Sequence, residues 1–230
     1  MEYIDLIRKR RSIRRYKNSP VTDHDLATIL EAARLAPSWS NRQCWQYIVV
    51  TDQSVKEKLA GAGRKWISEA PVIIVACADP AASGHKPGLD YFMLDIGISF
   101  EHLVLAATDL GLGTCWIGAF DEALAKEALA VPDNIRVVAY TPLGYPDEKK
   151  GQILARKPLR DFCFYEKYGQ VKSQGIHGKV ASRLVNLYIK GRRLSAKLRS
   201  KLVGIPPPNP ALGFIVEPLQ VMAEGIINYL

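Results

Sequence analysis

Three arginines and one serine lie within five residues near the start of the chain, in the segment Arg10-Arg11-Ser12-Ile13-Arg14. A guanidinium group is permanently charged and presents its N–H donors in a planar fork that matches the oxygens of a phosphate. Arg10 and Arg14, with the hydroxyl of Ser12 between them, therefore predict a site for one terminal phosphate. A solvated basic patch at a helix end is the alternative that these residues leave open.

A loop of polar and aromatic residues follows at positions 36–45, between a helical pattern and a strand pattern. Hydroxyl and amide groups can hydrogen-bond to the carbonyls and ring nitrogens of a planar heterocycle, and tryptophans can pack beside such a ring. The polar residues of this loop are Ser38, Ser40, Asn41 and Gln43, and its tryptophans are Trp39 and Trp45. An ordinary helix-to-strand connection does not need this combination. We interpret the two motifs together as a site for a phosphate and a ring.

The spacing of apolar residues predicts an α+β domain with helices packed on a central sheet. Helices are expected over residues 2–9, 23–35, 54–59, 91–110 and 121–130, and strands over 46–51, 71–77 and 135–140, with a short extended piece at 114–118. The uninterrupted apolar run at 71–77 is typical of a parallel strand covered on both faces. Residues 80–89 are rich in Pro, Gly and Ser, which indicates a loop. The helix 91–110 is apolar on more than one face, which fits either one large core or a helix shared with a second subunit.

The composition, 48% hydrophobic and 23% charged over 230 residues, is that of a globular protein. The N-terminus carries acids and lacks the apolar run of a cleavable signal, and the longest apolar stretches fall short of the roughly 20 residues that cross a bilayer. We therefore expect a cytoplasmic protein without a membrane span.

The cysteines and histidines are scattered, without the spacing of a zinc or iron–sulfur site. They are Cys44, Cys77, Cys115 and Cys163, and His24, His85, His102 and His177. We expect buried, reduced thiols and no metal site.

The net charge of +8 is concentrated near the C-terminus. Residues 166–230 contain ten Lys or Arg and three Glu, a net charge of +7, whereas residues 1–165 are nearly neutral. This division predicts a core domain at 1–165 and a basic, helical C-terminal extension at 166–230. The apolar face of that extension, which includes Val180, Leu184 and Leu187, is expected to pack on the core or on a partner subunit rather than on a membrane surface. A neutral body lacks the basic field that nucleic acids require, so no nucleic acid is expected as a partner.

Both motifs, together with residues 110–118 (LGLGTCWIG) and 143–146 (LGYP), resemble the nitroreductase family of flavoproteins. The resemblance extends in order from about residue 3 to residue 162. It implies a three-layer α/β/α sandwich with a central mixed sheet, and an obligate homodimer with two FMN sites at the subunit interface. It also implies NAD(P)H as the electron donor.

The resemblance also assigns contacts to FMN, group by group. The phosphate and ribityl ligands are Arg10, Arg11 (at least through its backbone), Ser12 and Arg14. The loop lent by the other subunit comprises Pro37, Ser38, Trp39, Ser40 and Asn41, with Gln43 just beyond it. The turn against the isoalloxazine ring is Ile117 and Gly118, the lysine near the pyrimidine edge is Lys65, and the basic residue that returns to the phosphate is Arg156. No side chain is expected to act as a nucleophile, because flavin itself carries hydride chemistry.

The sequence departs from the family pattern in three places. Cys44 stands where the family often has proline, the linker at 80–90 is short, and the residues beyond 165 match nothing in the family pattern. The cysteine spacing also excludes the ferredoxin module that some relatives carry.

We expect an FMN-dependent enzyme that uses NAD(P)H to reduce nitro compounds, quinones or similar conjugated acceptors by a ping-pong mechanism. One alternative keeps the fold and changes the reaction to flavin fragmentation, dehalogenation or oxidation of peptide-derived rings. Another is a flavin protein whose basic tail binds an anionic surface.

Overall fold

The structure is a computed structural model that describes residues 2–151 and 156–170. The chain divides into two units, Met1–Ala155 and Arg156–Leu230. In the second unit the described part contains a short 3-10 helix, η4 (Leu159–Asp161), followed by a turn in which the Tyr165 N–H donates to the carbonyl of Gln170. The predicted amphipathic helix of the extension lies outside the described residues.

A four-stranded sheet in the order β1-β2-β6-β5 forms the centre of the first unit. The strands are β1 (Trp45–Val50), β2 (Val72–Ala78), β5 (Gly113–Thr114) and β6 (Arg136–Gly144). Every residue of β2 is buried, as its apolar sequence predicts, but β2 is antiparallel to both neighbours. The expected parallel direction is therefore wrong, because a strand covered on both faces is equally apolar in either direction. An isolated bridge between Ser12 and Thr114 is parallel and adjoins strand β5 of the sheet.

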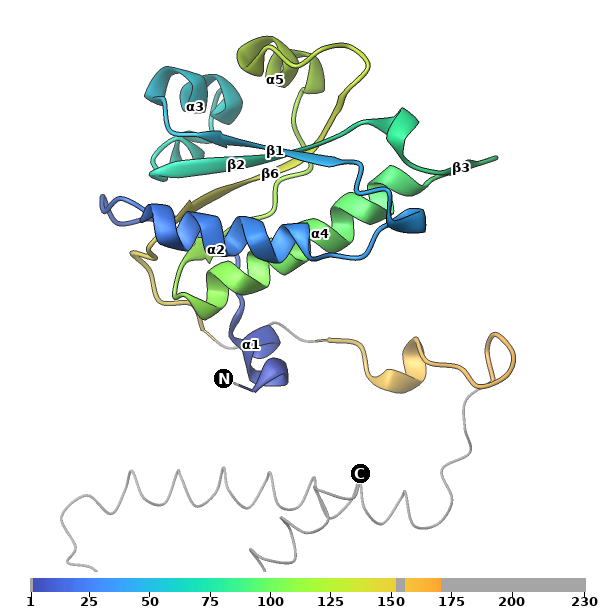
Figure 1. Cartoon of the computed structure of the whole chain (residues 1–230). Helices are drawn as coiled ribbons and strands as arrows, with labels where there is room; N and C mark the ends of the chain where they lie inside the picture. Colours follow the sequence, from blue (N-terminus) through green and yellow to red (C-terminus); the bar gives the residue numbers. More distant parts are fainter. Residues whose placement is uncertain (1, 152–155, 171–230) are drawn as a thin grey trace, which may run out of the picture. The chain divides into compact units, whose positions relative to one another are not determined.

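Helices cover both faces of this sheet, as Figure 1 shows. On one face, α2 (Asp23–Arg34) and α4 (Tyr91–Asp109) pack against the even-numbered residues of β2 in a cluster that includes Ile74. On the other face, α3 (Gln53–Ala60) and α5 (Glu122–Leu129) lie over the odd-numbered residues, including Ile73. Successive side chains of a strand point to opposite faces, so one apolar strand serves both cores. The predicted three-layer α+β fold is confirmed.

The helices α2, α3 and α5 begin where the sequence supplies a capping side chain. Thr22 accepts from the Asp25 N–H ahead of α2, Asp52 accepts from the Val55 N–H ahead of α3, and Asp121 caps α5. Such caps satisfy N–H groups that have no partner inside the helix. The first helix, α1 (Tyr3–Lys9), has no capping side chain and buries none of its residues.

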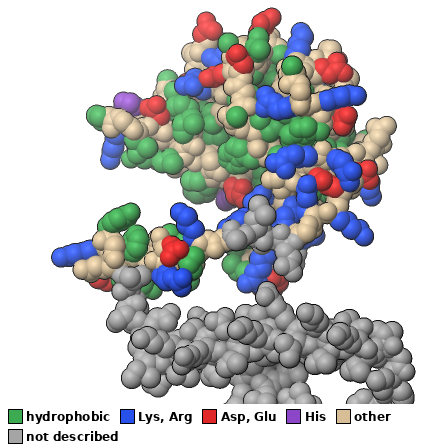
Figure 2. All heavy atoms as spheres, turned by 180° about the vertical axis from the view of Figure 1, so that it is seen from behind, with side chains coloured by type: hydrophobic (Ala, Val, Ile, Leu, Met, Phe, Trp, Pro, Cys, Tyr) green, Lys and Arg blue, Asp and Glu red, His purple; other side chains and the backbone are tan. Residues whose placement is uncertain are grey.

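The central helix α4 combines a buried side with an exposed apolar side. Met93, Leu94 and Ile98 are 52%, 49% and 40% exposed, although Phe100 and Leu103 of the same helix are fully buried. By length and composition alone α4 could cross a bilayer, but 56% of that stretch is buried inside the protein, as in the core helix of a globular domain. Figure 2 likewise shows hydrophobic side chains reaching the surface of the first unit between charged ones.

The segment 80–89 is more regular than the loop that its composition indicates. It contains the 3-10 helix η3 (Pro80–Ala82) and a hairpin of β3 (His85–Lys86) and β4 (Leu89–Asp90). Gly88, at the hairpin turn, has a φ of 77°. Pro followed by Gly at positive φ is typical of a tight turn, so the Pro87-Gly88 pair was the signal for this hairpin.

Candidate functional site

The arginine motif lies in an extended segment whose backbone is held on both sides. The Ile13 N–H donates to the Thr114 carbonyl (2.8 Å), and the Lys17 N–H donates to the Tyr145 carbonyl (2.8 Å). The Arg14 N–H donates to the carboxylate of Glu148 (2.6 Å). These contacts fix a strand-like segment between β5 and the residues that follow β6.

This segment points its side chains alternately inward and outward. Ile13 is buried and lies so close to Gly113 that a Cβ there would be 2.8 Å from the isoleucine, so glycine is required at position 113. Because side chains alternate along extended backbone, Ser12 and Arg14 share the side opposite Ile13. The structure therefore places the predicted phosphate ligands Ser12 and Arg14 together on the accessible side.

The guanidinium groups of Arg10 and Arg14 donate no hydrogen bond to any residue in the described ranges 2–151 and 156–170. The guanidinium of Arg14 lies over the ring of Trp66, 5.7 Å from its centroid. Arg10 lies near Glu101 of α4, where burial raises the pKa of the glutamate and the charge of Arg10 opposes that rise. Both arginines thus keep donors for an anion.

Arg11 differs from its two neighbours. Its guanidinium donates to the carbonyls of Gly151 (3.2 Å), Arg8 (2.5 Å) and Arg10 (2.7 Å). These bonds tie the end of α1 to residue 151 and satisfy carbonyls that the helix leaves unpaired. The side chain of Arg11 is structural, and its predicted backbone role toward a phosphate stays a prediction.

The polar loop contains the 3-10 helix η1 (Trp39–Asn41) and is conformationally strained. Ser40, Asn41 and Gln43 have φ values of 48°, 55° and 52°. Such left-handed conformations cost of order 1–3 kcal/mol each in residues other than glycine and persist only where the surroundings impose them. Inside the loop, the hydroxyl of Ser38 accepts from the Gln43 N–H (2.9 Å), and the Gln43 amide donates to the Asn41 side chain (3.2 Å). The predicted loop residues 38–43 therefore lie together.

Contacts from outside the loop fix its position. The Trp39 N–H donates to the carboxylate of Asp95 in α4 (2.8 Å), and the Trp39 ring occupies the space beside Gly84, where a Cβ would lie 2.4 Å from it. Sequence reasoning did not single out Asp95 or Gly84. The available signal was an acid within the apolar first half of the helix, because a buried charge requires partners.

The predicted ring contacts at 117–118 are partly inside the core. Ile117 exchanges backbone hydrogen bonds with Tyr140 (2.9 and 3.1 Å), and its side chain is buried among the residues of the α3–α5 layer. Its backbone and Gly118 are therefore the parts suited to a ring contact. Trp116, which was not assigned, is 42% exposed and meets Phe100 edge-on at 4.5 Å between ring centroids.

The remaining two predicted residues have different surroundings. Lys65 lies in η2 (Lys65–Ile67), and its side chain is 88% exposed, 3.9 Å from Glu69. The next residue, Trp66, lies under the guanidinium of Arg14, so Lys65 belongs to the neighbourhood of the arginine motif. Arg156 begins the second unit, and its predicted return to a phosphate stays a prediction.

One protomer does not bring the arginine motif and the polar loop together. The loop is anchored at Asp95, near the start of α4, whereas Ile13 and Arg11 line a hollow with Thr108 and Leu112, at the end of α4. At 1.5 Å per residue, Asp95 and Thr108 are about 20 Å apart along the helix. The two motifs therefore lie apart along α4 in one protomer.

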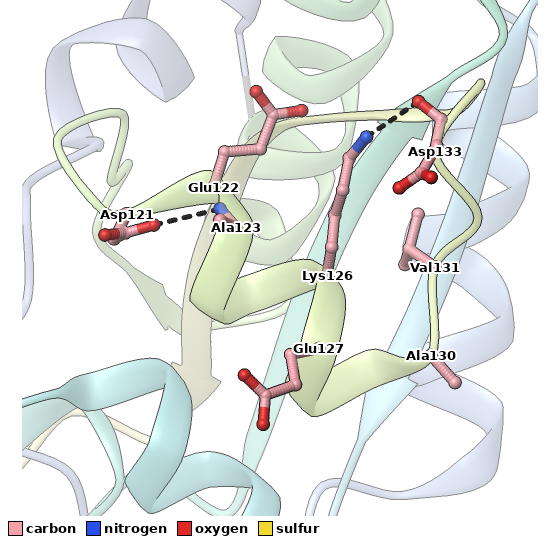
Figure 3. Close-up of a pocket in the computed structure, with 8 residues that line it drawn as sticks. All are labelled: Asp121, Glu122, Ala123, Lys126, Glu127, Ala130, Val131 and Asp133. Atoms are coloured by element: carbon pink, nitrogen blue, oxygen red, sulfur yellow. Dashed lines mark hydrogen bonds between the residues drawn. The ribbon is translucent and has the colours of Figure 1, made fainter.

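A broad, open hollow of about 900 Å³ lies elsewhere, on α5 and the residues after it, and Figure 3 shows its lining. Its charged groups are mostly acidic, and its Lys126 donates to the carbonyl of Asp133 (2.9 Å). This hollow contains none of the predicted site residues, and its charge is opposite to what a phosphate needs.

The thiols differ in burial. Burial, followed by the nearby Asp95 carboxylate, raises the pKa of Cys44 to about 11, and burial raises the pKa of Cys77 to about 11. Cys163 is exposed, so the expectation of buried thiols is wrong there.

Iodoacetamide at neutral pH is expected to modify Cys163 but not Cys44 or Cys77, because thiolates react and thiols do not. Peptide mass mapping would check this, and rapid labelling of Cys44 would contradict it.

Comparison with known proteins identifies relatives of most of the first unit. The family model described as the nitroreductase family matches residues 7–66 and 61–145. A putative NADH dehydrogenase/NAD(P)H nitroreductase of Archaeoglobus fulgidus is 38% identical over 155 residues, which cover 65% of this chain and 88% of the relative. The crystal structure of a nitroreductase family protein from Clostridium novyi NT is 36% identical with a TM-score of 0.62, covering 76% of this chain and 99% of that one. An FMN-dependent nitroreductase of Clostridium difficile R20291 is 30% identical with a TM-score of 0.62, covering 72% and 99%.

Proposed function

Because the chain belongs to the nitroreductase family, we propose that it is an FMN-dependent oxidoreductase that uses NAD(P)H to reduce nitro compounds, quinones or similar conjugated acceptors. The observation that carries the proposal is the arginine motif, in which Arg10 and Arg14 keep unused donors beside Ser12 on a rigid extended segment. The relatives described as an FMN-dependent nitroreductase and as an NAD(P)H nitroreductase support the cofactor and the electron donor.

The residues present fit FMN at both of its ends. Two guanidinium groups and a hydroxyl match the charge and the acceptor oxygens of a terminal phosphate. The hydroxyl and amide groups of Ser40, Asn41 and Gln43 match the polar edge of a flavin ring, and they lie on a loop whose conformation is already set. When bound, FMN supplies the hydride chemistry, and the protein's part is to bind and orient it.

We propose that the complete site forms between two copies of the chain. Asp95, which contacts the polar loop, and Thr108, which lies beside Ile13, are about 20 Å apart along α4, so a second protomer is proposed to bring the two motifs to one flavin. The exposed apolar residues Met93, Leu94 and Ile98 of the same helix supply a surface that a second copy can cover. An apolar helix face that remains in water is unfavourable, and its burial stabilises a dimer by roughly 25 cal/mol per Å².

Donor and acceptor are proposed to occupy the same cleft in succession. The described residues provide one polar loop and one arginine motif per protomer, and a separate dinucleotide fingerprint is lacking in the sequence. Release of NAD(P)⁺ before the acceptor enters gives ping-pong kinetics.

Reconstitution with FMN tests the proposal. The purified dimer is expected to bind one FMN per protomer and to show parallel double-reciprocal plots with NADH or NADPH and a quinone or nitroaromatic acceptor. Failure to retain flavin after reconstitution would rule out the function, and intersecting plots would rule out the shared cleft. The alternative reactions of this fold would be favoured if the protein oxidised reduced flavin with oxygen, or turned over a halogenated aromatic, faster than it reduced nitro compounds and quinones.

Three further expectations stay predictions: the cytoplasmic location, the division at residues 165–166 and the docking of the tail.

A further inference from the structure

We propose that Asp95 is a positioning residue for the flavin: its buried carboxylate holds both ends of the strained turn at 40–43 and thereby sets how tightly that turn can grip the flavin of the partner subunit. This inference rests on the proposed function, and it concerns a residue that lies outside both sequence motifs. The segment that Asp95 positions, residues 38–44, is called the positioned loop.

The carboxylate of Asp95 is 3% exposed and accepts hydrogen bonds from separate segments of the chain. Its Oδ1 accepts from the Trp39 N–H (2.8 Å), and its Oδ2 accepts from the Ser83 hydroxyl (2.9 Å) and the Cys44 thiol (3.5 Å). A carboxylate only accepts, and each of these three partners can donate. The buried charge is therefore stabilised by donors alone, two of which belong to the positioned loop.

The two loop contacts enclose the strained residues. Trp39 comes directly before Ser40, and Cys44 comes directly after Gln43, so one carboxylate fixes both ends of a turn with three residues at positive φ. The bonds inside the positioned loop join Ser38, Asn41 and Gln43 to one another and set its shape, but they do not attach it to the core. The Asp79 N–H donates to the carbonyl of Cys44 (3.1 Å), and the Trp39 ring packs beside Gly84 and 5.9 Å from the ring of Tyr91. Asp95 is the side chain that adds hydrogen bonds to both Trp39 and Cys44.

The carboxylate of Asp95 is held in place by the packing of α4 in the core. Its neighbours Ile96 and Phe100 are fully buried against the sheet, so the carboxylate moves only if the core moves. Leu94, the preceding residue, belongs to the exposed apolar side of α4 that is proposed to face the partner. Asp95 thus sets the place of the positioned loop relative to the helix of the proposed interface.

If Asp95 had only a structural role, its replacement would lower the stability of the protein without changing its affinity for FMN. Ser99 provides the matched control. Ser99 lies one turn further along α4, is fully buried, and donates to the carbonyl of Ala33 (2.9 Å) while it pairs with the hydroxyl of Tyr47 (2.7 Å). It ties α4 to α2 and β1, and not to the positioned loop.

The experiment compares Asp95→Ala, Asp95→Asn and Ser99→Ala with the unchanged protein. The dissociation constant of FMN is measured on apo-protein by quenching of flavin fluorescence, and the rate of tryptic cleavage after the exposed Arg42 is measured without flavin. Thermal unfolding is recorded for each variant. Asp95→Ala is expected to weaken FMN binding by about 10- to 100-fold, the worth of a hydrogen bond to a buried charge, and to accelerate cleavage after Arg42.

The variants Asp95→Asn and Ser99→Ala distinguish an effect on the position of the loop from an effect on the stability of the protein. Asp95→Asn is expected to stay within about threefold of the original affinity, because its oxygen still accepts from Trp39 and its amide can donate to Ser83 or Cys44. Ser99→Ala is expected to lower the unfolding temperature while FMN affinity and cleavage after Arg42 are unchanged. If Asp95→Ala does not fold, Ser83→Ala decides, because it removes one bond to Oδ2 and should shift both measurements in the same direction by a smaller factor.

The proposal is overturned if Asp95→Ala binds FMN as tightly as the original protein, or if Ser99→Ala weakens binding to the same extent. It is also overturned if Ser83→Ala, used in its place, leaves both measurements unchanged. Absence of FMN binding by the unchanged protein would instead refute the proposed function. In that case the tryptic rates still report whether Asp95 holds the positioned loop.

Discussion

Replacement of Arg14 by alanine is expected to weaken FMN binding by about 100-fold, because it removes charge-assisted hydrogen bonds to the phosphate from a guanidinium with no other hydrogen-bond acceptor among the described residues. The backbone of the segment is held by Thr114, Tyr145 and Glu148, so the fold should be retained. Titration of apo-protein with FMN measures the effect, and the unfolding temperature shows that the fold is intact.

Two further variants test whether the loss of FMN affinity reflects a specific contact between Arg14 and the phosphate. Arg14→Lys keeps the charge but not the planar fork, and about a tenfold loss of affinity is expected. Arg8→Ala removes a nearby exposed arginine that pairs with Asp5 (3.3 Å), and it should leave FMN affinity within about twofold, since exposed pairs of this kind contribute little. An equal loss in Arg8→Ala and Arg14→Ala would indicate a general effect of positive charge and contradict a specific phosphate contact.

Replacement of Ile98 by glutamate is expected to convert the dimer into a monomer and to abolish measurable FMN binding, a loss on the order of 100-fold or more. Ile98 is 40% exposed in the single protomer, so the substitution leaves the monomer fold intact. In a dimer that covers this side of α4, two unpaired charges would be buried, which costs several kcal/mol. Sedimentation velocity gives the oligomeric state, and flavin titration on the same samples gives the affinity.

Leu124→Glu is the matched control for this substitution. Leu124 is 60% exposed on α5, in the opposite layer of the sandwich, and it should change neither the oligomeric state nor FMN binding. A monomeric Ile98→Glu protein that still binds FMN tightly would show that one protomer holds the flavin alone. A variant that remains dimeric would place the interface elsewhere.

Local features of this fold follow from the sequence, whereas features that depend on distant segments do not. Helix and strand positions follow from apolar spacing and capping residues, which are local, and the family motifs follow from short strings such as residues 10–14 and 110–118. The direction of β2 was wrong because its partners are distant in sequence, and a strand buried on both faces carries the same apolar pattern in either direction. The hairpin at 85–90 was missed although Pro87 and Gly88 signalled its turn.

The residue types at the site were determined by the sequence alone: arginines and a serine suited to a phosphate, a polar loop suited to a ring, and the family that combines them. Tertiary structure alone decided which arginines remain available, because Arg11 uses its donors on carbonyls that include one 140 residues away. It also decided that the two motifs lie apart along α4, and that Asp95 anchors the positioned loop. The physical reason is that hydrogen-bond partners and burial depend on which distant segments meet, and chemical type and local spacing do not encode that.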